Sequence, residues 1–185
     1  MKITDKKIIF LALVVFGIVY RIVQPHPANV APIGAIALFS GFFFRRYWAF
    51  AVPVVVLLIT DFFLGYYEWK LMMAVYGSFM LIAFIGMGIK KTGSILPVIT
   101  GSLAGSIIFF IVTNFSVWVF GNWYPHDLAG LAHCYYLALP FFRNTLLGDM
   151  FFAGVIFGSY ELALYIKHRF VLKNDSQEYS SVHKF

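Results

Sequence analysis

The sequence predicts an all-α integral membrane protein, a compact bundle of six transmembrane helices. Composition is the first observation behind this prediction. The chain has 185 residues, of which 61% are hydrophobic and 12% are charged, whereas a soluble domain carries about a quarter charged residues. The second observation is that apolar runs recur between Ile8 and Ile166, with small charged clusters between them. A helix needs about 20 apolar residues to cross a bilayer.

The charged clusters predict the orientation of the chain. They alternate along the sequence between strongly basic clusters and nearly neutral ones. The strongly basic clusters hold every Lys and Arg except Arg21, Lys70 and Arg143. Cytoplasmic loops are enriched in Lys and Arg, so this alternation predicts an even number of crossings with both termini in the cytoplasm. We therefore expect a multi-pass protein of the bacterial inner (cytoplasmic) membrane. Its net charge of +6 is explained by this bias and does not indicate a nucleic-acid partner.

The predicted spans follow the apolar runs, and a polar segment follows the last of them. Pro32 suits the first turn of the second span, and Pro53 predicts a kink in the third. We predict one transmembrane domain over residues 1–172 and a polar cytoplasmic tail over 173–185. The six predicted spans are Lys7–Val23, Pro32–Phe44, Tyr47–Leu64, Leu71–Ile89, Leu96 to about Phe120, and Leu146–Lys167.

Residues 121–145 are predicted to form an ordered loop on the outer side, between the fifth and sixth spans. The segment is rich in Trp, Tyr, His and Pro, which is not the composition of a disordered region. Its apolar part, 130–142, is too short to cross a bilayer. Long loops in compact proteins are commonly functional, so we expect this loop to cap the outer face and to contain a short interfacial helix.

Polar side chains at the outer ends of the spans are the candidate functional residues, because ionisable groups in a bilayer are costly and mark functional sites. They come from several separate junctions of the chain but lie at one predicted depth. A six-helix bundle would bring them around one outward cavity. The candidate substrate-binding residues are Arg21, His26, Asn29, Asp61, Asn114, Trp118, Trp123, Tyr124, Tyr135, Phe142, Arg143, Asn144 and Asp149.

Structural roles stay open for the same residues. Arg21 and Arg143 can extend to lipid headgroups, or they can pair with Asp61 and Asp149 inside the bundle. Asn114 and Asn144 can cap helices or join them by hydrogen bonds. Trp118, Trp123 and Tyr124 can form an interfacial belt. His26 lies between two prolines in a stiff turn, which favours a functional role.

Glycine pairs and one inner carboxylate complete the predicted bundle. Gly101 with Gly105 and Gly154 with Gly158 have the Gly-x-x-x-Gly spacing that lets helix backbones approach closely. We expect both pairs to pack within the bundle, and an interface between two chains is the alternative. Glu161 lies in the inner half of the sixth span. It either pairs with a neighbouring helix or couples transport to protons.

The sequence holds no catalytic or metal-binding signature, so we expect no enzymatic activity, no metal and no cofactor. His126, His133 and Cys134 are suitable metal ligands, but their spacing matches no known ligand pattern. Cys134 is the single cysteine, so no internal disulfide forms. A membrane-embedded metal-binding or redox enzyme that uses these three residues remains the alternative, and a scaffold subunit without a ligand is a third hypothesis.

Two runs of the sequence match motifs of a known family. They are Arg21-x-x-x-Pro25-His26-Pro27-x-Asn29-x-x-Pro32-x-Gly34-Ala35 and Thr60-Asp61-x-x-x-Gly65. With six short helices and both termini inside, the chain resembles the substrate-binding S components of energy-coupling factor vitamin transporters. It resembles more closely an uncharacterised transport-related offshoot of that superfamily. The motifs shared with this offshoot are Thr113-Asn114-Phe115-x-Val117-Trp118, Cys134-Tyr135, Pro140-Phe141-Phe142-x-Asn144-Thr145-Leu146-x-Gly148-Asp149 and Phe157-Gly158-x-x-Glu161.

The resemblance implies a protein that captures a vitamin or related micronutrient, a corrinoid being one example, from the outer side for uptake. Its partners would be the small-molecule substrate and the lipid bilayer. S components usually dock on an energy-coupling membrane subunit and its ATPases through Ala-x-x-x-Ala in the first helix. Residues 8–23 contain no such pair, which favours a solitary, cobalamin-type member. The driving force stays open between ATPases, a proton gradient through Glu161 and trapping inside the cell.

Overall fold

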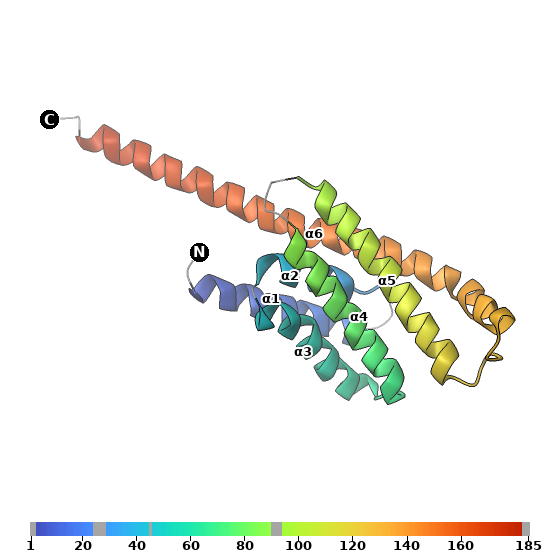
Figure 1. The fold of residues 1–185 in the computed structure, drawn as a ribbon. Helices are drawn as coiled ribbons and strands as arrows, with labels where there is room; N and C mark the ends of the chain where they lie inside the picture. Colours follow the sequence, from blue (N-terminus) through green and yellow to red (C-terminus); the bar gives the residue numbers. More distant parts are fainter. Residues whose placement is uncertain (1–2, 24–28, 45, 90–93, 183–185) are drawn as a thin grey trace.

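The structure is a computed structural model that describes residues 3–23, 29–44, 46–89 and 94–182, with side chains described for 5–23, 29–44, 46–89 and 94–169. Within these ranges the chain is all-helical, which confirms the all-α part of the predicted fold class (Figure 1). The six helices of the described residues are α1 (Ile3–Ile22), α2 (Ile33–Phe43), α3 (Tyr47–Leu64), α4 (Trp69–Gly88), α5 (Leu96–Phe120) and α6 (Leu128–Val182).

Four of the helices in the described chain are long and apolar enough to cross a membrane, namely α3, α4, α5 and α6 as far as Arg169. The other two differ in separate ways. Helix α2 is apolar but has only 11 residues, which is about 16 Å of helix. Helix α1 has 20 residues, but it carries charged side chains in its first and last turns.

Helix α2 is the centre of the bundle. Every residue from Ile33 to Phe43 except Phe42 is buried, and α2 contacts each of the other five helices. A helix that is apolar on all sides is stable only when protein or lipid covers all of them. The other helices supply that cover, so α2 positions the elements around it.

Two glycines let α2 and α4 approach to backbone contact. A Cβ atom added to Gly41 would overlap the main-chain oxygen of Ala83, and one added to Gly86 would overlap that of Leu38. Only residues without a side chain allow so close a crossing. Close packing through small residues therefore occurs here, although the predicted glycine pairs lie elsewhere in the sequence.

The two predicted glycine pairs behave differently. Gly101 and Gly105 of α5 face Leu38 of α2 and Ile82 of α4, at 3.1–3.2 Å from the position of an added Cβ, so the predicted packing is confirmed. Gly154 and Gly158 of α6 have no described atom within 4 Å of that position. The expectation that this second pair packs inside the bundle is wrong.

The predicted outer loop over 121–145 is also wrong, and the helix that contains the predicted last span begins well before Leu146. Helix α6 begins at Leu128, so only residues 121–127 connect it to α5. Asp127 stabilises this start, because its Oδ1 accepts a hydrogen bond of 2.7 Å from the Gly130 amide. Some of the rings and one of the two prolines that indicated a loop, Pro140, lie within α6.

Helix α6 bends relative to α5. Ser106 and Asn114 lie about two turns apart on α5. Their partners on α6 are Asp149 and Cys134, which lie about four turns apart. A proline inside a helix removes one main-chain hydrogen bond and commonly kinks the helix, so Pro140 accounts for the bend.

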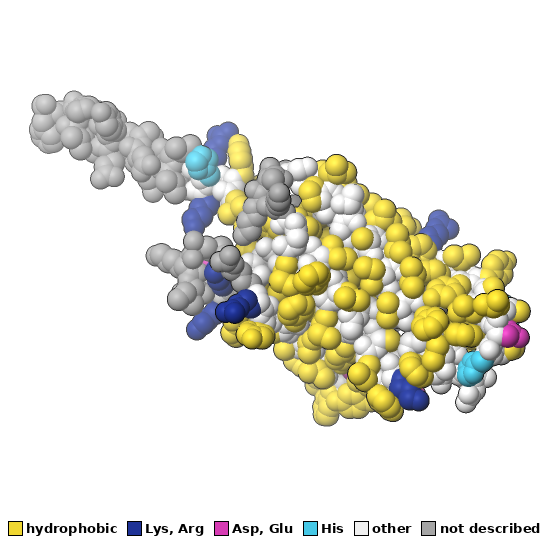
Figure 2. All heavy atoms as spheres, viewed as in Figure 1, with side chains coloured by type: hydrophobic (Ala, Val, Ile, Leu, Met, Phe, Trp, Pro, Cys, Tyr) yellow, Lys and Arg dark blue, Asp and Glu magenta, His cyan; other side chains and the backbone are white. Residues whose placement is uncertain are grey.

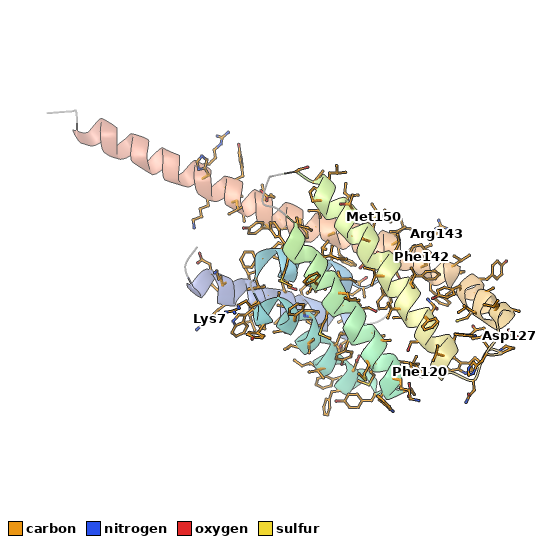
Figure 3. All side chains as sticks on the ribbon, in the orientation of Figure 1. Lys7, Phe120, Asp127, Phe142, Arg143 and Met150 are labelled. Atoms are coloured by element: carbon orange, nitrogen blue, oxygen red, sulfur yellow. The ribbon has the colours of Figure 1, made fainter. Side chains whose placement is uncertain are left out.

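The bundle has a basic end and an opposite end, which we name the Asp127 end. Figure 3 places Lys7 and Asp127 at these opposite ends, and Lys6, Arg46 and Lys167 line one hollow at the basic end. Figure 2 shows hydrophobic side chains over the middle of the face in view. The start of α1 and the end of α6 both lie at the basic end (Figure 1). Helix α6 runs to Val182, past the predicted domain boundary at 172.

Candidate functional site

A cavity of about 110 Å³ lies between α5 and α6, toward the Asp127 end, and we name it the outer cavity. Three predicted site residues line it: Asn29 from the segment before α2, Asn114 from α5 and Phe142 from α6. Its walls also include Phe110, Thr113 and Thr145. Distant parts of the chain therefore converge on one small, largely aromatic cavity with amide and hydroxyl groups.

The two asparagines reach the outer cavity for different reasons. Asn29 has a left-handed backbone with φ of 61°, a conformation that Asn tolerates better than most residues. Asn114 is half-buried, and its Nδ2 donates a hydrogen bond of 2.8 Å to the Phe110 carbonyl one turn earlier. This bond holds the Asn114 side chain along α5.

Aromatic rings form the wall between α5 and α6. The ring of Phe142 lies 4.6 Å from that of Phe110, and the ring of Tyr135 lies 5.4 Å from Phe110. Tyr135 donates its hydroxyl to the Ile111 carbonyl at 2.7 Å, so its polar group joins two helices. Phe142 lines the cavity, whereas Tyr135 supports it from behind.

Arg21 and Asp61 form a buried ion pair away from the outer cavity. Arg21 Nη1 lies 2.9 Å from Asp61 Oδ1, and Asp61 is 1% exposed. Arg21 also donates to the hydroxyl of Thr60, and Tyr76 donates to Asp61 Oδ2 at 2.9 Å. These contacts join α1, α3 and α4. The structural alternative of an Arg21–Asp61 pair is confirmed, and neither residue lines the outer cavity.

Tyr67 adds a phenol to the surroundings of this ion pair. It lies in the short connection between α3 and α4. Burial is the main cause that raises the pKa of Tyr67 to about 12; the negative charge of Asp61 raises it further, and the charge of Arg21 opposes the rise. The phenol therefore stays neutral at physiological pH, and the Arg21–Asp61 pair keeps its balance of charge.

Asp149 is buried at the contact of three helices. It is 6% exposed, and its Oδ2 accepts a hydrogen bond of 2.8 Å from Ser106 of α5. A Cβ atom at Gly34 of α2 would overlap this carboxyl group, so only glycine leaves room for it. The alternative of an Asp149–Arg143 pair is wrong, because Arg143 is exposed and lies on the outward side of α6 (Figure 3).

The predicted residues of the α5–α6 connection form contacts of their own. Trp118 Nε1 donates to the Pro125 carbonyl at 2.9 Å, the ring of Tyr124 lies 5.7 Å from that of His133, and Trp123 is 72% exposed. None of these three lines the outer cavity. Asn144 is half-buried beside it on α6. His26 lies outside the described residues.

No group of three or more His, Cys, Asp or Glu side chains that could hold a metal occurs among the residues with described positions. The three suggested ligands contact separate partners. His126 lies against Trp118, and His133 lies against Tyr124. Cys134 is buried, with its Sγ 3.5 Å from the Asn114 carbonyl. The geometry therefore adds no support to the metal-binding alternative.

Several residues of these contacts were not predicted. Ser106 and Tyr76 are the partners of the two buried carboxyl groups, and Phe110 lines the outer cavity. All three lie within apolar runs, where hydroxyl groups and rings are common and carry no signal of a partner. The useful signal was a buried acid, since each buried carboxylate requires a hydrogen-bond donor.

A protein family described as a family of unknown function, DUF6580, matches residues 1–173. The chain belongs to this family. No curated protein and no solved structure matches the chain. The family's description names no activity, so the function is inferred from the geometry above.

Proposed function

We propose that this protein is a substrate-binding membrane transport protein similar to an S component. It captures a small ring-containing micronutrient from the outer side of the bacterial cytoplasmic membrane for uptake. Both termini lie in the cytoplasm in this proposal. The bound partners are the nutrient and the surrounding lipid, and no chemical reaction is catalysed.

Two features support the membrane placement. The described chain contains four helices that are long and apolar enough to cross a bilayer. Basic side chains of α1, the α2–α3 turn and α6 surround one hollow at the basic end, as expected for a cytoplasmic face. The outer cavity lies toward the opposite end, so it would open to the outside.

The outer cavity is the observation that carries the proposal. Asn29, Asn114 and Phe142 are far apart in the sequence but line the same space. Selective ligand pockets combine aromatic walls with a few fixed polar groups. The outer cavity has this composition, and it lies beside the bend in α6, where a small change in the helix would admit a ligand.

The volume of the outer cavity favours a small ligand. Pockets for drug-sized molecules have volumes of about 300–1,000 Å³, whereas the outer cavity has about 110 Å³. A single aromatic or heteroaromatic ring matches this space better than a corrinoid does. We therefore propose a one-ring micronutrient as the substrate.

We also propose that the protein acts without an energy-coupling subunit docked on α1. The outward face of α1 carries large side chains, and Leu11, Val15 and Val19 are each at least half exposed. A close helix contact needs small residues at this position. Trapping inside the cell or proton coupling then remains as the driving force.

Native mass spectrometry of protein extracted in mild detergent tests the proposal. We expect a copurifying small molecule of low mass. Phe142→Ala and Asn114→Ala should each weaken its binding at least tenfold, about 1.4 kcal/mol, because each removes one wall of the outer cavity.

Trp123→Ala is the matched control, because Trp123 is an exposed ring at the same end of the molecule and does not line the cavity. It should bind the molecule as the unchanged protein does. The proposal fails if no small molecule is retained, or if all three variants lose it equally.

A further inference from the structure

A second and larger cavity lies on the opposite half of the α5–α6 contact. Its volume is about 480 Å³, and we name it the inner cavity. Apolar side chains, among them Val98 and Ile99 of α5 and Phe157 of α6, form most of its walls. The proposed transport function does not use this space, because the buried Ser106–Asp149 contact separates it from the outer cavity.

One wall of the inner cavity is formed by the glycines of α6. Gly154 and Gly158 both line it, and no described atom lies within 4 Å of a Cβ built on either residue. The spacing that normally brings helices together therefore borders empty space here. An elongated apolar group can lie along this strip in direct contact with the backbone.

Ser102 places an unused hydroxyl in the same cavity. The residue is 4% exposed, and among the described residues its Oγ has no hydrogen-bond partner. By contrast, Ser106, one turn further along α5, has a partner, because its hydroxyl donates to Asp149. A buried polar group without a partner is destabilising, so a ligand that hydrogen-bonds to Ser102 would remove this cost.

Glu161 supplies the charge at the other end of the cavity. It is exposed and is the one charged residue among those that line this space. Glu161 takes no part in the Arg21–Asp61 ion pair. A carboxylate beside an apolar cavity favours a ligand with a positive charge.

The two polar groups define the length of the ligand. Ser102 lies one turn from Ser106 toward the basic end, which places it near the level of Ala153 on the antiparallel α6. From Ala153 to Glu161 the helix rises about 12 Å. The cavity therefore matches an extended molecule with an amine at one end and a hydrogen-bonding group about 12 Å away.

We propose that the inner cavity binds an amine-bearing amphiphile. Its ammonium group contacts Glu161, its apolar chain lies along Gly154 and Gly158, and a hydroxyl or carbonyl group bonds Ser102. Such an amine has two sources: a free long-chain amine, or the ethanolamine headgroup of a phospholipid. This site is separate from the outer cavity and does not depend on the proposed transport function.

Photo-crosslinking in lipid nanodiscs tests this site on the full chain. The discs contain phosphatidylcholine, which has no primary amine, and the probe is a long-chain ω-amino alcohol with a diazirine in its chain. We expect crosslinks at residues that line the inner cavity, such as Met150 and Phe157. The unlabelled amino alcohol should compete at least tenfold better than a diol of the same length.

Three variants separate the contributions. Glu161→Gln should remove the preference for the amine over the diol, and Glu161→Asp should retain it. Ser102→Ala should weaken the binding of the amino alcohol and of the diol several-fold, and to the same extent. Gly154→Leu should abolish crosslinking, whereas Gly77→Leu should not, because Gly77 is an equally open glycine on α4 that lies outside this cavity.

Adding phosphatidylethanolamine to the discs identifies the source of the amine. If this lipid competes with the probe, the site binds a headgroup. If it does not compete, the site binds a free amine. Equal binding of amine and diol would overturn the proposal, as would crosslinks spread over α3. A disulfide-linked dimer through Gly154→Cys would also overturn it, since a second chain would then fill the cavity.

Discussion

Buried polar groups on the two sides of α2 differ in whether they have partners. On the side of α1, α3 and α4, the Asp61 carboxylate is paired with Arg21 and accepts a hydrogen bond from Tyr76, and α2 touches α4 backbone to backbone. On the α5–α6 side, the buried hydroxyl of Ser102 lines one cavity and the amide of Asn114 lines another. The hydroxyls of Ser102 and Ser116, both on α5, lack partners within the described chain.

This difference separates a structural half from a candidate binding half. Saturated polar groups and close backbone packing stabilise one arrangement. Cavities and unpaired groups cost stability, and they are retained where a ligand or a motion uses them. In our proposal, function therefore lies at the contact of α5 with α6.

The largest effect is expected at the buried ion pair. Asp61→Ala should lower the free energy of unfolding by about 3 kcal/mol, because it leaves the Arg21 charge without its partner. The fall is measured from thermal unfolding in detergent, followed by tryptophan fluorescence. The double variant Arg21→Met with Asp61→Leu should recover much of the loss, since no unpaired charge remains. An unchanged transition in Asp61→Ala would contradict a structural role for this half.

A smaller effect is expected at the glycines. Gly41→Ala should destabilise the protein by about 2 kcal/mol, because the added methyl group overlaps the Ala83 carbonyl oxygen. Gly154→Ala is the matched control in the other half. It should be neutral or stabilising by about 0.5 kcal/mol, because alanine is the better helix former and the space is open. Equal losses in the same thermal assay would remove the contrast between the halves.

The smallest effect is expected at two serines one turn apart on α5. Ser106→Ala should cost about 1 kcal/mol, because the buried Asp149 carboxyl group loses its hydrogen bond. Ser102→Ala should raise stability by about 1 kcal/mol, because it removes a buried hydroxyl that has no partner within the described residues. Chemical unfolding curves with matched slopes measure the difference. A loss of stability in Ser102→Ala would show that this hydroxyl is already bonded within the protein.

Part of the candidate site was predictable from the sequence. Polar residues in apolar runs indicated Asn114, Asp61 and Asp149, and all three prove to be at least half-buried in the bundle. Their grouping was not predictable. The helices direct Asp61 toward α1 and α4 but direct Asn114 toward α6, because a side chain's direction depends on the rotation of each helix within the bundle.

The start of α6 shows a second limit of sequence reasoning. Residues 128–145 combine rings, Pro140 and short apolar stretches, which is a pattern typical of a loop. Contacts from Tyr135 and Cys134 to main-chain oxygens of α5 hold this segment as a helix. Such tertiary contacts override local preference, and a single sequence contains no sign of them.

The sequence by itself determined the helical class and the ends of most helices. Apolar length and charge position control these features locally, and Tyr47–Leu64 was predicted to the residue. Tertiary structure alone decided which carboxylate is paired with which donor, where glycines meet and where they leave space. Those outcomes depend on how whole helices turn and cross, and the crossing of α2 with α4 at Gly41 and Gly86 is one such contact. Helices packed around a buried centre divide the polar groups between a saturated half and an open half only once the bundle has formed.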